Sequence, residues 1–179
     1  MSTAGDLAAA LALLDRAGDS ALWSRAWVLV RLNRAAEALV VYQELAPELL
    51  SEPAPALNVL QASRALDVGA ALLRTDSKAQ GRALIERALP PLTPPPPDRV
   101  LSYFRWQGVL GYALLGARDQ AFAVLQQRVA DGEFVGLVHL DTDPLLAELR
   151  ADPRYERIVA PARAKAAEQV RLAREAGLL

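Results

Sequence analysis

Apolar residues recur along this chain at helical spacing, in segments that are separated by short polar turns. Glycine and proline are concentrated between these segments, and no stretch alternates apolar and polar residues for long, as a half-buried strand would. The pattern therefore predicts an all-α fold. The expected helices span residues 5–17, 20–32, 35–50, 55–74, 77–89, 98–115, 118–131, 143–150, 152–160 and 161–176.

One unit occurs three times: a helix, a short polar turn, and a second helix that opens on a small residue. These small residues are Ala38, Gly81 and Ala121, and a large apolar residue follows each of them four positions later. Small residues opposite large ones are expected where two antiparallel helices approach closely. A single helical hairpin cannot bury its own apolar face, so we expect the hairpins to stack into a superhelix.

The middle unit, with Val68-Gly69, Leu72, Gly81 and Ile85, resembles the tetratricopeptide repeat, whose hairpin is about 34 residues long. The segment from Asp141 to Tyr155, which contains Asp-Pro-Leu-Leu and Asp-Pro-Arg-Tyr, resembles the end of bacterial tetratricopeptide arrays. The resemblance implies a short right-handed α-α superhelix of three hairpins with a helical cap. We expect a single domain with an N-terminal helix in residues 1–18, the hairpins in 19–135 and the cap in 136–179.

The repeats lie further apart than those of the family, and proline-rich stretches between the hairpins accommodate the extra residues. The most pronounced is Pro94-Pro95-Pro96-Pro97, which favours polyproline II. It is interpreted as a stiff spacer between two repeats, and the alternative is a ligand for an aromatic-lined groove.

Charge and composition exclude several classes of function. The chain has 179 residues, with 20 basic residues against 21 acidic ones and no cysteine. This balance gives no electrostatic footprint for nucleic acid or an anionic membrane, and disulfides and cysteine-based zinc sites are ruled out. The N-terminus lacks the basic region of a secretory signal, and no apolar run is long enough to span a bilayer. We expect a cytoplasmic protein, although a periplasmic domain of a membrane protein would have the same composition.

The only histidine lies beside two carboxylates in His139-Leu140-Asp141-Thr142-Asp143. One hypothesis is a metal or acid–base site, because imidazole and carboxylate oxygens can share one ion. The alternative is a surface turn whose aspartates cap the helix that begins at Pro144. We favour the second interpretation and expect no catalytic residues, no metal and no cofactor.

In the architecture that the resemblance implies, the first helix of each hairpin lines an inner groove. On this register the inner face has aromatic, apolar and arginine side chains, and tryptophan and arginine are enriched at binding hot spots. For Trp23 and Trp27 the alternative is ordinary core packing against the N-terminal helix. The candidate partner-binding residues are Trp23, Trp27, Arg31, Leu66, Arg74, Tyr103, Trp106 and Leu110.

These observations predict a non-catalytic protein-interaction module that binds a peptide or helix in an apolar groove. Because Arg31 and Arg74 lie one unit apart, the expected ligand has one or two acidic groups. The alternative hypothesis is a sensor or regulatory domain of a larger bacterial regulator, such as a winged-helix transcription factor or a cyclase. Such a domain would bind a small ligand or self-associate as a homo-oligomer.

Overall fold

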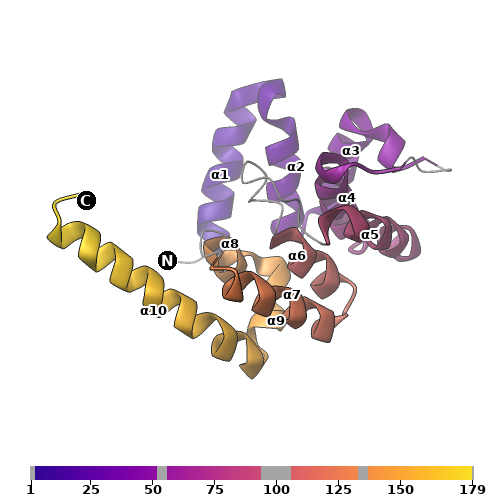
Figure 1. Cartoon of the computed structure of the whole chain (residues 1–179). Coiled ribbons are helices and arrows are strands. Elements are labelled where there is room, and N and C mark those ends of the chain that lie inside the picture. The colour runs from indigo at the N-terminus through magenta and orange to yellow at the C-terminus, as the bar shows by residue number, and fades with distance from the viewer. Residues whose placement is uncertain (1–2, 52–55, 94–105, 133–136, 179) are drawn as a thin grey trace.

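The computed structural model describes residues 3–51, 56–93, 106–132 and 137–178, and all regular structure in these ranges is helical. The all-α prediction is confirmed. Figure 1 shows the helices packed side by side, with the C-terminal helix projecting from the body. The helices are α1 (Thr3–Ala17), α2 (Leu22–Arg31), α3 (Ala35–Leu45), α4 (Val59–Leu72), α5 (Lys78–Leu92), α6 (Gln107–Leu114), α7 (Arg118–Ala130), α8 (Leu137–Thr142), α9 (Ala147–Arg150) and α10 (Pro153–Glu175). Short 3₁₀ turns span Gly18–Ala21 (η1), Pro47–Leu49 (η2) and Pro144–Leu146 (η4).

Three helical hairpins form where the repeat predicts them, by the packing of α2 on α3, α4 on α5 and α6 on α7. The first and third turns end their first helix in the same way, because Asn33 and Gly116 both adopt positive φ, at 61° and 74°. In each turn the next amide bonds back to the first helix, from Arg34 to the carbonyl of Leu29 and from Ala117 to that of Tyr112. This is the Schellman arrangement, which reverses the chain and satisfies carbonyls at the helix end.

The predicted register of small and large residues is also observed. Ala38, Gly81 and Ala121 are buried at the start of the second helices. The large residues that follow them are fully buried, namely Tyr42, Ile85 and Leu125. The closest approach is between α4 and α5, where a Cβ added to Gly81 would lie 2.9 Å from the carbonyl oxygen of Gly69. Glycine at both positions lets the two backbones come together.

Several helix boundaries differ from the predicted ones. The predicted division between 152–160 and 161–176 is wrong, because α10 runs through Pro161 as one helix. Proline removes one helical hydrogen bond, and Pro161 is exposed, so water can solvate the carbonyl that loses its donor. Helix α8 was not predicted, since its six residues are too few to show a helical period. The spacer interpretation of residues 94–97 lies outside the described residues.

The core has two parts, one around α2–α5 and the other around α6, α7 and the C-terminal segment. The C-terminal segment returns toward the start of the chain, because η4 packs on α6 and Leu145 packs against the first part of the core. The first half of α10 packs on α7 and buries Tyr155, Val159 and Ala162. Among the described residues, no helix combines the length and the apolar composition needed to cross a membrane.

Candidate functional site

The C-terminal end of α2 carries a buried arginine. Arg31 is 8% exposed, and its guanidinium donates from Nη2 and Nε to Oδ2 of Asp143, at 2.7 and 3.1 Å. Its Nη1 donates to the carbonyl of Trp27 at 3.2 Å, one turn back along α2. Arg31 was predicted to face a ligand with acidic groups, and in the structure the chain supplies that acidic group itself.

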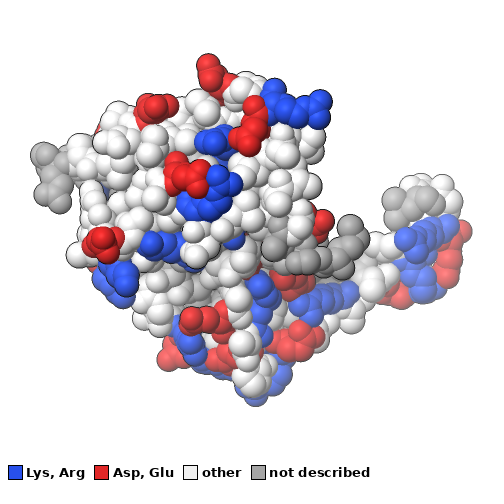
Figure 2. All heavy atoms as spheres, turned by 180° about the vertical axis from the view of Figure 1, so that it is seen from behind, with Lys and Arg blue, Asp and Glu red and all other residues white. Residues whose placement is uncertain are grey.

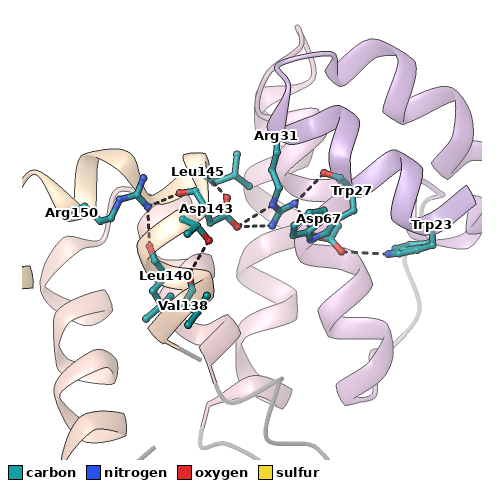
Figure 3. A network of polar contacts seen from close by, with 10 residues as sticks. Trp23, Trp27, Arg31, Asp67, Val138, Leu140, Asp143, Leu145 and Arg150 are labelled. Atoms are coloured by element: carbon teal, nitrogen blue, oxygen red, sulfur yellow. Dashed lines mark hydrogen bonds and ion pairs between the residues drawn. The ribbon is translucent and has the colours of Figure 1, made fainter. Parts of the chain in front are cut away.

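Asp143 is held in place by the segment around it (Figure 3). Its Oδ1 accepts from the amide of Leu145 at 2.9 Å, so that it caps the turn that begins at Pro144. Arg150 donates to the carbonyls of Asp143 and Leu140, at 2.6 and 2.8 Å. The interpretation of this aspartate as a helix cap is therefore confirmed.

The metal alternative for the same segment has no support in the geometry. Asp141 accepts from the hydroxyl of Tyr155 at 2.9 Å and pairs with Arg163. Within the described ranges, no group of three or more histidine, aspartate or glutamate side chains could hold a metal ion. The two aspartates are instead used to fasten the C-terminal segment to the rest of the fold.

A second carboxylate lies on the other side of Arg31, in the middle of α4. Asp67 is buried, its Oδ1 is 3.9 Å from Nη1 of Arg31, and its Oδ2 accepts from Nε1 of Trp23 at 3.4 Å. Burial raises the pKa of Asp67 to about 6. The charge of Arg31 and the Trp23 hydrogen bond oppose this rise, and the negative charge of Asp143 adds to it.

Asp67 forms part of the floor of an open groove of about 550 Å³ between α2 and α4. On one side the groove is lined by Trp23 and Trp27, which are both partly exposed. On the other side lies Leu60, which is 52% exposed. The remaining lining residues are Ser24, Val28, Ser63 and Arg64.

The two tryptophan rings of the groove are also contacted by arginines. The guanidinium carbon of Arg31 lies 3.5 Å from the ring centroid of Trp27, and that of Arg64 lies 4.9 Å from the ring centroid of Trp23. The Trp23 ring also packs against Tyr42, with 4.9 Å between centroids. These contacts fix the tryptophans in position and leave part of each ring open to the groove.

The other predicted groove residues are distributed differently. Leu66, Trp106 and Leu110 are buried in the core, and Arg74 is exposed with its Nη1 donating to the carbonyl of Ala70 at 2.9 Å. Tyr103 lies outside the described residues. The structure thus brings Trp23 and Trp27 together at an open surface and places Arg31 beneath it. A partner-binding role for the eight predicted residues stays a prediction.

The residues of α4 that line the groove were not predicted from the sequence. Leu60, Ser63, Arg64 and Asp67 follow one another at helical spacing and so lie on one face of α4. Asp67 interrupts an otherwise apolar run, and this could have identified the site, because a charge in a buried helix face needs a partner.

The surface of the molecule agrees with the balanced composition. On the face drawn in Figure 2, acidic and basic side chains are interspersed, and neither sign forms a broad patch among the residues that are coloured by charge. Comparison of the chain with protein-family models, with curated proteins and with solved structures finds no match. The function therefore has to be argued from the site itself.

Proposed function

We propose that this chain is a non-catalytic protein-interaction module that binds a peptide or a helix in the groove between α2 and α4. The observation that carries the proposal is the apolar surface that Trp23, Trp27 and Leu60 leave open there. Apolar surface of this kind is unfavourable in water, and partly exposed tryptophans are typical anchors of protein interfaces.

The arrangement of the helices supports the same proposal. Helix α4 packs on both α2 and α6, so the first helices of successive hairpins lie next to one another, as in stacked repeats. A tetratricopeptide-like solenoid would build its binding surface from these helices. We extend the proposal to this architecture, with α8 to α10 as the terminal cap.

The position of the cap limits where a partner can bind. Asp143 already covers Arg31, and Leu145 packs against the core nearby. A partner therefore has access to the part of the surface that begins at Trp27 and extends past Trp23 to Leu60. This is the region in which the groove is found.

A peptide-display selection against the immobilised full chain tests the proposal. The selected peptides are then measured by fluorescence anisotropy against wild type, Leu60→Ser and the matched control Val138→Ser, since both positions are exposed apolar residues, at 52% and 66%. We expect Leu60→Ser to weaken binding about tenfold by removing apolar contact, which corresponds to roughly 1.4 kcal/mol, while Val138→Ser has little effect. Equal binding to all three proteins would show that the groove is not the binding surface.

A further inference from the structure

We infer that the groove between α2 and α4 selects a basic anchor, an alkylammonium group whose nitrogen donates to Asp67 and whose carbon chain lies between Trp23, Trp27 and Leu60. The inference rests on the proposed function for the location of the site. It adds the chemistry of the group that the partner inserts. Because the proposed ligand is a peptide, we assign this group to one of its lysine side chains, and a free aliphatic amine is the other outcome of the test.

Asp67 has unused hydrogen-bonding capacity. An ionised carboxylate can accept about four hydrogen bonds. From the residues that the structure describes, Asp67 accepts one, from Trp23 at the long distance of 3.4 Å. Arg31 stays 3.9 Å away, because its nearer partner is Asp143 at 2.7 Å. A buried carboxylate with so few donors is unfavourable unless a further donor reaches it.

The described neighbours of Asp67 supply no second hydrogen-bond donor from within the fold. The charge of Asp67 also acts on Tyr42 of α3, yet the buried Tyr42 hydroxyl has no hydrogen-bond partner among the described residues. The charged groups that act on Asp67 are Arg31 from α2 and Asp143 from the segment before η4. Arg31 is shared between two carboxylates, and Arg74 acts on Arg31 and Asp143 but is not among the charges that act on Asp67. A cationic ligand that reaches Asp67 would therefore give this carboxylate the close partner that Arg31 gives to Asp143.

The walls of the groove fit the carbon chain of such a ligand. The groove volume of about 550 Å³ accommodates an extended aliphatic chain, and apolar walls with a few polar groups at one end are typical of ligand sites. The carbon chain would contact indole and leucine surface, while the ammonium group would gain from the nearby rings. Ser63 also lines the groove and adds a hydroxyl that can accept from the same ammonium.

Arg64 repels a cationic ligand, so removing its charge tests whether the bound anchor is basic or acidic. It is exposed at the groove over Trp23, where water screens its charge and its long side chain can turn away. If the anchor is basic, removal of the Arg64 charge strengthens binding and removal of the Asp67 charge weakens it. An acidic anchor requires both effects to be reversed.

The experiment compares hexylammonium chloride with hexanol, its neutral counterpart, on the full chain at pH 7.5. Binding is followed by the indole N–H resonance of Trp23, with that of Trp106 in the other part of the core as the internal reference. We expect hexylammonium to bind about tenfold more tightly than hexanol, as an ion pair with cation–π contact allows. Asp67→Asn should remove this preference, and Arg64→Gln should increase it. Asp76→Asn, an exposed acid outside the groove, is the matched control.

Wild type alone provides a second measurement in case Asp67→Asn does not fold. At pH 5 the preference for hexylammonium should fall, because Asp67 has a pKa of about 6 and is then mostly protonated. A lysine-containing tripeptide, acetyl-Leu-Lys-Leu-amide, and its glutamine counterpart distinguish a side-chain anchor from a free amine. Equal binding of hexylammonium and hexanol to wild type at pH 7.5, or weaker hexylammonium binding by Arg64→Gln, would overturn the inference. If Leu60→Ser still weakens binding of the selected peptides in that case, the proposed function stands.

Discussion

Replacing Gly81 by alanine tests the closest packing in the fold with a single methyl group. Gly81 lies in the first turns of α5, against α4. A Cβ at this position would lie 2.8 Å from the amide nitrogen of Leu73, 2.9 Å from the carbonyl oxygen of Gly69 and 2.9 Å from Cβ of Leu72. Two of these three are backbone atoms, so no side-chain rotation can relieve the overlap. The helices have to move apart.

Two effects of opposite sign determine the size of the change. Alanine is favoured over glycine inside a helix by about 1 kcal/mol. Overpacking a close contact costs about 1–3 kcal/mol, and the backbone overlaps place Gly81→Ala at or above the upper end of that range. We therefore expect a net loss of about 2 kcal/mol in the free energy of unfolding. Gly81→Leu should lose at least as much.

Urea unfolding followed by circular dichroism measures this loss. For a chain of this size, a loss of about 2 kcal/mol also lowers the melting temperature by roughly 4–8 °C. Gly5→Ala in α1 is the matched control, because a Cβ there meets nothing within 4 Å, and it should stabilise the chain by about 0.5–1 kcal/mol. If Gly81→Ala were as stable as wild type, the proposed register of α4 against α5 would be refuted.

Two further predictions concern the buried charges. The folded pKa of Asp67 is about 6 against an ordinary 3.8, so its contribution to stability is fully present below pH 3.8 and is lost as the pH rises through 6. The free energy of unfolding of Asp67→Asn, relative to that of wild type, should therefore rise by about 3 kcal/mol from pH 3.5 to pH 7.5. Urea unfolding at both pH values measures this difference, and a difference that does not change with pH would contradict the prediction. Arg31→Met should cost about 3–5 kcal/mol, because it leaves Asp143 and Asp67 buried without their shared cation. A midpoint within error of wild type would show that this pairing is not formed.

The repeat pattern predicted most of the helical framework because its signals are local. The turns at Asn33 and Gly116 need a residue that tolerates positive φ, and this preference is visible in the sequence. The small residues Ala38, Gly81 and Ala121 mark the helix contacts for a similarly local reason. The cap at Asp143 follows from its position before Pro144.

The pairing of Arg31 with Asp143 could not be predicted in this way, because the two residues are 112 positions apart. Several other aspartates in the chain offer the same local chemistry, and only the path of the C-terminal segment back to α2 selects Asp143. The continuity of α10 through Pro161 was not predicted for a different reason. A proline such as Pro161 usually ends a helix, but here the lost hydrogen bond faces water.

This one long-range contact changes what the groove is expected to bind. In the sequence alone, Arg31 is an unpaired cation beside Trp27, and it predicts an acidic ligand. In the fold, Asp143 neutralises Arg31, and the buried Asp67 accepts only the long hydrogen bond from Trp23 among the described residues. The preferred ligand charge therefore depends on which carboxylate holds the arginine. Because Arg31 is 2.7 Å from Asp143 and 3.9 Å from Asp67, the geometry favours a basic anchor in the groove.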